Sequence, residues 1–308
     1  MAALFFAEMR FDPKDPHNPD ALVERGKLLW QANDLPGARA DLQAAVELQP
    51  RNAQALQALG AVLLLGSDVE GAERRLVDAT NEAPTMPAAR LWLGRALLAR
   101  GDGPGAIAQL KTGAELAPKD AEIRLALGLA YEKTGSLQEA LDSYQAAAQA
   151  APTLAEPLKR IGQIYQAANR CGDAIPPYQR AAELDPKASA VRLALGECTA
   201  RMGGHDKAVQ IYQAVLKADP GAVQAYYLMA RSVHESKGAR AAQPWYERAA
   251  EKEPANPMPH YYLGYAYKER GERARAVAEF KAYLRAKPDA LDKSDIEREL
   301  EDLGAGNP

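Results

Sequence analysis

Histidine and cysteine are the side chains best suited to metal binding or nucleophilic catalysis, and this 308-residue sequence contains few of them. No histidine belongs to the H-E-x-x-H pair of a zinc protease, and none stands with a cysteine at metal-ligand spacing. The sequence also lacks a phosphate-binding G-x-x-x-x-G-K loop and a G-x-S-x-G nucleophile turn. We therefore expect no catalytic, metal-binding or cofactor-binding residues, and we predict that the chain is not an enzyme. The four histidines are His17, His205, His234 and His260.

The only two cysteines, Cys171 and Cys198, fall on helical positions that should face neighbouring helices. Two cysteines do not make the disulfide framework of a small secreted protein. Their positions favour the interpretation that both are small core hydrophobes, although pairing between them stays open.

Instead of a local motif, the sequence has a period of 34 residues that continues to residue 288. Proline, alanine and glycine each recur at this spacing, and only the glycine column is interrupted, at Ala230. A fixed period of this length indicates a stack of structural repeats. The proline column is Pro50, Pro84, Pro118, Pro152, Pro186, Pro220, Pro254 and Pro288. The alanine column is Ala38, Ala72, Ala106, Ala140, Ala174, Ala208, Ala242 and Ala276. The glycine column is Gly26, Gly60, Gly94, Gly128, Gly162, Gly196 and Gly264.

The residues at these columns resemble the tetratricopeptide repeat pattern W-x2-L-G-x2-Y, followed by alanine, an aromatic residue and proline. The fourth repeat carries the pattern as Leu127, Gly128, Tyr131, Ala140, Tyr144, Ala147 and Pro152. The resemblance implies an all-α fold, a right-handed superhelical solenoid of stacked antiparallel helix pairs. Counting from seven residues before each position of the glycine column, Ala230 included, gives eight repeats, at 19–52, 53–86, 87–120, 121–154, 155–188, 189–222, 223–256 and 257–290.

Helix-pair physics agrees with this resemblance. Each helix of a pair exposes an apolar stripe, so one pair cannot bury its own core, whereas stacked neighbours can. The glycine and alanine columns are expected where two helix backbones approach closely. At Ala230 the extra methyl should cost about 1–3 kcal/mol of overpacking, offset by about 1 kcal/mol of helix propensity.

The ends of the chain differ from the repeats. Residues 1–18 are a leader of foreign appearance, and roughly the first 20 residues resemble a fragment of transketolase, without that family's cofactor motifs. Residues 291–308 are expected to form a capping helix and tail, with the helix beginning at Ser294 and Glu297 completing a capping box. The leader is not a signal peptide. We expect a bacterial-type cytoplasmic protein, unless a foreign leader has replaced an original export signal.

Composition narrows the classes of partner. The net charge of −3 supplies no global basic field, so nucleic-acid binding is not expected. No run approaches the ~18 apolar residues of a membrane span, and none is expected.

The family resemblance places the second, fifth, ninth and twelfth positions of each repeat along a concave groove. At three of these columns, the fifth, ninth and twelfth, basic residues outnumber acidic ones, which predicts a partner with acidic and apolar residues. The predicted groove residues are Tyr227, Arg231, Tyr261, Tyr265 and Lys268 near the C-terminal end, and Leu91, Arg95, Leu98, Leu125, Leu129 and Lys159 in the middle.

The leading hypothesis is therefore a non-catalytic scaffold that binds a peptide or protein in its concave groove. One alternative is an accessory or regulatory module of a larger enzyme or transferase assembly. A further alternative is a helical-repeat RNA binder, which the acidic charge balance disfavours. Self-association through the exposed apolar groove also stays open.

Overall fold

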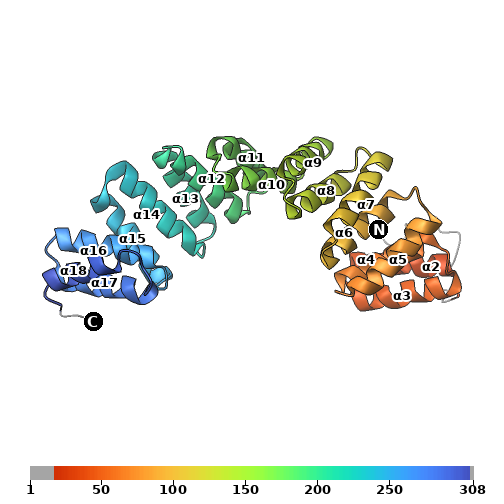
Figure 1. The fold of residues 1–308 in the computed structure, drawn as a ribbon, viewed down its shortest axis with the longest axis horizontal. Helices are drawn as coiled ribbons and strands as arrows, with labels where there is room; N and C mark the ends of the chain where they lie inside the picture. Colours follow the sequence, from red (N-terminus) through yellow and green to blue (C-terminus); the bar gives the residue numbers. More distant parts are fainter. Residues whose placement is uncertain (1–16, 306–308) are drawn as a thin grey trace. The chain divides into compact units, whose positions relative to one another are not determined.

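The computed structural model describes residues 17–305, and within them 17 α-helices, α2 to α18, occur without any β-strand (Figure 1). The helices form two compact units, residues 1–153 (unit 1) and 154–308 (unit 2). The repeat columns continue through this boundary unchanged, so the sequence pattern predicts one uninterrupted stack and does not reveal the division. Residues 1–16, which carry most of the transketolase-like leader, lie outside the described residues.

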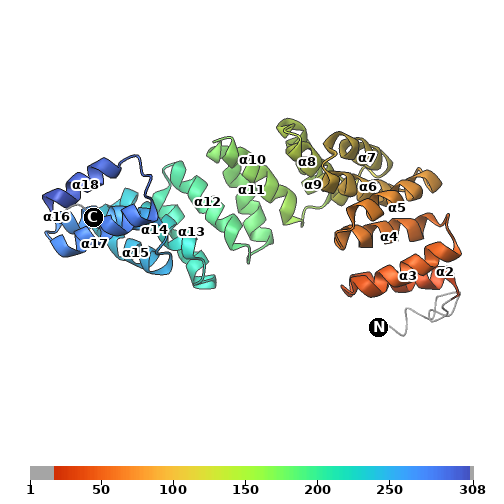
Figure 2. The same cartoon turned by 60° about the horizontal axis from the view of Figure 1, so that its bottom comes forward.

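Within each unit, consecutive helices form the antiparallel pairs that the repeat pattern predicts (Figures 1 and 2). Unit 1 contains α2 (Pro19–Gln31), α3 (Leu35–Leu48), α4 (Ala53–Leu65), α5 (Val69–Glu82), α6 (Pro87–Arg100), α7 (Gly103–Leu116), α8 (Ala121–Lys133) and α9 (Leu137–Ala150). Unit 2 contains α10 (Ala155–Ala167), α11 (Cys171–Leu184), α12 (Ser189–Arg201), α13 (His205–Ala218), α14 (Val223–Lys237), α15 (Ala239–Lys252), α16 (Pro257–Glu269), α17 (Arg273–Ala286) and α18 (Lys293–Asp302).

The core of each unit is built on columns of small residues. All eight members of the alanine column are 0% exposed. The glycine column lies against a second column, at the twenty-fourth position of the repeat, whose side chains would collide with any added β-carbon. A Cβ on Gly60 would lie 2.5 Å from Leu76 Cγ, and one on Gly128 would lie 2.5 Å from Tyr144 Cε1. The twenty-fourth column is Leu42, Leu76, Leu110, Tyr144, Tyr178, Tyr212, Tyr246 and Phe280.

Ala230 interrupts the glycine column, and its partner in the twenty-fourth column is Tyr246. Both are buried, at 0% and 2% exposure. The Tyr246 ring stacks on Tyr262, with ring centroids 4.8 Å apart and an interplanar angle of 15°. The extra methyl is therefore accommodated next to a stacked ring pair, an arrangement that the column pattern does not predict.

The turn between the two helices of a repeat requires a positive φ at its fifteenth position. Glycine reaches this conformation without steric cost, and asparagine tolerates it better than most residues. Repeat 7 has Lys237 at this position, and there α14 extends through it to a turn at Gly238 (φ 85°). The residues of positive φ are Asn33, Ser67, Gly101, Gly135, Asn169, Gly203 and Gly271 in the other seven repeats.

A side chain at the fourth position of several repeats reaches back to the carbonyl oxygen of the preceding column proline. Arg124 Nε donates to Pro118 O at 2.7 Å, and His260 Nε2 lies 3.1 Å from Pro254 O. The second ring nitrogen of His260, Nδ1, lies 2.6 Å from Glu279 Oε2. This contact with the Glu279 carboxylate is the main reason that the pKa of His260 is raised, although burial and the charge of Arg285 oppose it. Arg90 and Tyr226 make the same contact with Pro84 and Pro220.

The C-terminal helix α18 buries Ile296 and Leu300 against the last repeat, as predicted for a capping helix. The predicted capping box is wrong, because the helix begins at Lys293 and Asp292 takes the N-cap position without a side-chain capping bond. The Asp292 carboxylate instead accepts a hydrogen bond from the Tyr283 hydroxyl at 2.6 Å.

The glycine column makes a testable prediction about stability. Gly128→Ala should lower the free energy of unfolding by about 1–2 kcal/mol, because the new methyl overlaps the Tyr144 ring by more than helix propensity returns. The matched control is Gly172→Ala in α11, where the nearest atom to an added Cβ is 3.8 Å away. Urea denaturation followed by circular dichroism should show a lower midpoint for the first variant only, and equal midpoints would contradict the close-approach argument.

His260 predicts a pH dependence. The pKa of His260 is raised in the folded chain by its contact with Glu279. The stability that this contact contributes is therefore complete below the unfolded pKa of 6.5 and is lost as the pH rises through the higher folded pKa. We expect roughly 1 kcal/mol of stability to disappear between pH 6 and pH 9. His260→Arg keeps a charged donor at the position where Arg90 and Arg124 bind the same carbonyl, so its thermal midpoint should fall less over this range. Parallel curves for the two proteins would disprove the linkage.

Candidate functional site

A catalytic or metal centre is not indicated by the described part of the chain. Within residues 17–305, no group of three His, Cys, Asp or Glu side chains is placed to hold a metal ion. Cys171 and Cys198 are buried free thiols, and burial together with the neighbouring Cys171 raises the pKa of Cys198 to about 12. At neutral pH the Cys198 thiol is therefore protonated and a poor nucleophile. No helix in the described range is long and apolar enough to span a membrane.

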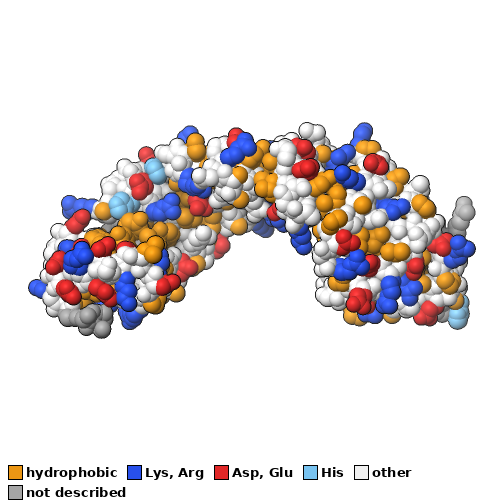
Figure 3. Space-filling model, in the orientation of Figure 1, with side chains coloured by type: hydrophobic (Ala, Val, Ile, Leu, Met, Phe, Trp, Pro, Cys, Tyr) orange, Lys and Arg blue, Asp and Glu red, His pale blue; other side chains and the backbone are white. Residues whose placement is uncertain are grey.

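The predicted tyrosines of unit 2 belong to one connected group of aromatic rings on α14, α15 and α16. Tyr261 makes edge contacts with Tyr265 and Tyr262, with centroids 5.0 and 5.4 Å apart. Tyr262 stacks on Tyr246, which lies 6.4 Å from Tyr227. Tyr227, Tyr261 and Tyr265 are each half-buried, so part of every ring contacts solvent. Figure 3 shows hydrophobic side chains gathered over these helices.

The hydroxyls of Tyr227 and Tyr265 stay protonated at neutral pH. Burial, followed by the proximity of Tyr261, raises the pKa of Tyr265 to about 12. Burial also raises the pKa of Tyr227, against the opposing effect of the Arg231 charge. The group therefore offers a partner apolar ring edges together with neutral hydroxyl donors.

The positive charges predicted along the inner helices are mostly neutralised by carboxylates of the chain itself. Glu122 and Glu156 stand at the second position of their repeats and Glu24 at the sixth, outside the three columns whose charges suggested a basic groove. Ion pairs join Lys27 to Glu24 (2.7 Å), Arg95 to Glu122 (2.8 Å), Lys159 to Glu156 and Lys268 to Glu299. A generally basic groove is thus not what the structure presents.

Arg231 on α14 is the exception. Across residues 17–305, no carboxylate lies within ion-pair distance of it. Burial raises the pKa of the Tyr212 and Tyr246 hydroxyls, and the charge of Arg231 opposes part of that rise. Arg231 thus carries an unpaired positive charge at the edge of the aromatic group.

The predicted leucines of unit 1 separate into two classes. Leu91 is 4% exposed and belongs to the core, so it offers a partner almost no surface. Its inclusion among the groove residues is corrected, since the fifth position of that repeat packs inward. Leu98, Leu125 and Leu129 are half-buried and keep part of their surface in solvent.

Unit 1 also contains an aromatic contact that the sequence reading missed. Trp30 and Trp92 meet edge to face with ring centroids 5.4 Å apart, although 62 residues separate them in sequence. The Arg95 guanidinium lies 4.7 Å from the centroid of the Trp92 ring while pairing with Glu122. Trp92 stands at the sixth position, outside the columns assigned to the groove, so only the three-dimensional stack brings it to Trp30.

The twelfth position of the repeat has a role that the sequence reading did not assign. Glu132, Gln166 and His234 contact the hydroxyls of the column tyrosines twelve residues later, at 2.5, 2.7 and 3.3 Å. These predicted groove side chains thus also satisfy buried phenols. A sequence signal existed, because the twelfth residue is Trp30, Leu64 or Leu98 where the twenty-fourth is leucine, and polar in these three tyrosine repeats.

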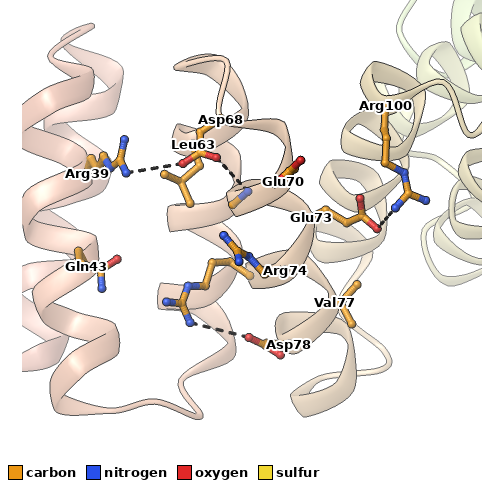
Figure 4. A pocket seen from close by; sticks show the side chains of 12 residues that line it. Arg39, Gln43, Leu63, Asp68, Glu70, Glu73, Arg74, Val77, Asp78 and Arg100 are labelled. Atoms are coloured by element: carbon orange, nitrogen blue, oxygen red, sulfur yellow. Dashed lines mark hydrogen bonds and ion pairs between the residues drawn. The ribbon is translucent and has the colours of Figure 1, made fainter.

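A depression on the surface of unit 1 lies on α3, α5 and the end of α6 and encloses about 880 Å³ (Figure 4). Its charges are largely paired within the chain, as Arg39 lies 3.6 Å from Asp68 and Arg100 lies 2.6 Å from Glu73. Four arginines face four carboxylates in its lining, so it has no excess of either charge.

Comparison with known proteins agrees with this architecture. The family model described as tetratricopeptide repeat matches residues 23–87, 68–118, 91–155, 159–223, 200–257 and 227–290. The chain belongs to the tetratricopeptide repeat (TPR) family. Proteins of this family are typically interaction scaffolds and are generally not catalytic. None of the matched segments includes the leader.

Solved structures show the same TPR fold. The C-terminal part of a TPR protein from Cytophaga hutchinsonii is 18% identical, with a TM-score of 0.69, and the match covers 78% of this chain and 98% of that one. YrrB, described as a TPR protein with an unusual peptide-binding site, is 22% identical over 60% of this chain and 95% of its own, with a TM-score of 0.55. MamA is 26% identical over 54% of this chain and 91% of its own, with a TM-score of 0.51. Comparison with curated protein sequences finds no significant match.

The tryptophan contact of unit 1 can be tested by a double-mutant cycle. Trp30→Ala and Trp92→Ala should show a coupling energy of about 0.5–1.5 kcal/mol in urea denaturation, because each removes the other's ring partner. Trp245 on α15 is the control, since its ring contact is with Arg248 and its removal should be additive with that of Trp30. Additive effects for Trp30 and Trp92 would show that the contact contributes nothing.

Proposed function

We propose that this TPR protein is a non-catalytic scaffold that binds a peptide or protein segment on the inner helices of unit 2. The observation that carries the proposal is the group formed by Tyr227, Tyr261 and Tyr265, whose rings are connected but half-exposed. Tyrosine rings held by their neighbours lose little conformational entropy on binding and are enriched at interface hot spots. The peptide-binding site named for YrrB supports the proposal by analogy of fold alone.

The charges of the inner face define what such a partner should look like. Because Lys159 and Lys268 are already paired with Glu156 and Glu299, the partner gains little from a general negative charge. Apolar side chains that fill the spaces between tyrosine rings should supply most of the affinity. On unit 1, Leu98, Leu125 and Leu129 offer a smaller apolar surface that extends the same mode of binding.

The proposal predicts the result of a capture experiment. The Tyr227→Ala, Tyr261→Ala, Tyr265→Ala triple variant should lose a partner that the wild-type protein retains from an extract of the source organism. Three aromatic contacts at about 1 kcal/mol or more each imply a weakening of at least about a hundredfold in the dissociation constant. The partner is identified by mass spectrometry and its dissociation constant is then measured with purified components.

The control replaces Trp245, an aromatic residue on α15 whose ring contacts Arg248, with alanine. That variant should bind like the wild-type protein, and circular dichroism should show that both variants keep their helices. Equal retention by the triple variant and the wild type would refute the proposed site.

A further inference from the structure

The inner face of unit 2 holds one group of hydrogen-bond donors that the rest of the chain does not satisfy. The group lies where α14 faces the turn between α12 and α13, and its central residue is Arg231. Other groove cations have carboxylate partners, as shown by Arg95 at the same ninth position of repeat 3, which pairs with Glu122. Within residues 17–305 Arg231 has no ion pair, and its charge opposes the rise that burial causes in the pKa of Tyr227.

The second observation comes from the column tyrosines. In repeats 4, 5 and 7 the tyrosine hydroxyl contacts the twelfth side chain of its own repeat. Repeat 6 has Ala200 at that position, which is too short to reach Tyr212 and carries no acceptor. The structure records no acceptor for the Tyr212 hydroxyl among residues 17–305, although its ring is 1% exposed. Repeat 6 is thus the one tyrosine repeat in which the inner face does not provide the acceptor.

The third observation is a hollow of about 270 Å³ at the same place. Ala200 and Arg231 both line it, together with Arg201, His205, Ser232 and Glu235. The buried Nδ1 of His205 has no hydrogen-bond partner in the described structure. Arg201 donates to the Asn169 side chain and is not paired with a carboxylate of the described residues. Two arginines and one glutamate leave the lining with a net charge of +1, which a single carboxylate would neutralise.

We infer that this hollow receives a carboxylate of the bound peptide, either an Asp or Glu side chain or the C-terminal carboxylate. The carboxylate oxygens would accept hydrogen bonds from Arg231 and take the place that Glu132 and Gln166 occupy in repeats 4 and 5. An apolar side chain of the same peptide would lie on Tyr227, one helical turn before Arg231 on α14, and the peptide would continue toward Tyr261 and Tyr265. This inference rests on the proposed function and names the chemistry that its site selects.

The test uses random twelve-residue peptides with free C-termini, displayed on phage and selected on the immobilised full-length protein. Enriched peptides are synthesised, and their dissociation constants are measured by fluorescence polarisation. We expect a shared acidic residue or a requirement for the free C-terminus. Glu→Gln or Asp→Asn replacement in the peptide and C-terminal amidation distinguish the two sources of the carboxylate, and one of them should weaken binding at least about tenfold.

Three variants of the protein complete the test. Arg231→Gln should weaken the same peptides at least about tenfold, whereas Arg248→Gln, which removes the same charge from α15 outside the groove columns, should change binding less than about twofold. Ala200→Gln should also weaken binding about tenfold, because it introduces the side chain that satisfies Tyr178 in repeat 5 and fills the hollow from within. Its thermal midpoint should be unchanged or higher, which separates occlusion from unfolding.

The outcomes distinguish this inference from the proposed function. Peptides that lose binding to Tyr261→Ala but bind Arg231→Gln as tightly as the wild type would overturn the carboxylate site and leave the proposed groove intact. Enriched peptides that tolerate both neutralisation of their acids and amidation would do the same. Selection of no peptide at all would overturn the proposed function and the inference together.

Discussion

Close approach of the two helices within each repeat is the constraint on which the rest of this molecule depends. In seven of the eight repeats it places glycine at the eighth position, because the twenty-fourth side chain occupies the space where a β-carbon would lie, and only repeat 7 accommodates an alanine, Ala230. Once the pair is closed, the alanine column is sealed from solvent and each pair presents its remaining apolar stripe to the next. The family pattern assigns the fifth, ninth and twelfth positions to the inner face, so the proposed binding surface is a by-product of core packing.

The inner face that results is less charged than its composition suggests. Ion pairs within one helix or between adjacent repeats absorb most of its lysines and arginines, and exposed pairs of this kind contribute little to stability. Their consequence is for recognition, since a neutralised cation no longer attracts an acidic partner at long range. The proposed recognition therefore relies on the tyrosine rings and on donors such as Arg231 that have no carboxylate partner within residues 17–305.

The sequence predicted the fold far better than the site, and the reason is physical. Repeated packing constraints act at every thirty-fourth residue, so columns such as Ala38 to Ala276 are visible without coordinates. The helix bounds followed from the same columns, except at α18, where Ser294 and Glu297 matched a capping box that the chain does not use. Groove residues have no comparable repetition. Leu91 turned out to be buried, and Trp92 contacts Trp30 from an unassigned position, because exposure at one position depends on how far its neighbours extend. The positive charge of the groove was overestimated for a related reason. The comparison of basic and acidic residues covered the fifth, ninth and twelfth positions, whereas the ion-pair partners Glu122 and Glu156 stand at the second.

The hydrogen bonds from column tyrosines to the twelfth position connect interior and surface through shared atoms. A substitution at Gln166 or His234 must keep an acceptor for the hydroxyl of a buried tyrosine. A substitution that removes this acceptor should lower the stability of the fold. At Leu98 no such obligation exists, since Leu110 beneath it needs no acceptor. The first three repeats are therefore free to change their exposed twelfth residue, whereas in repeats 4, 5 and 7 that residue must stay polar to serve the tyrosine beneath it. Diversification of this scaffold should proceed unevenly along its length, fastest where the column beneath the surface is purely aliphatic.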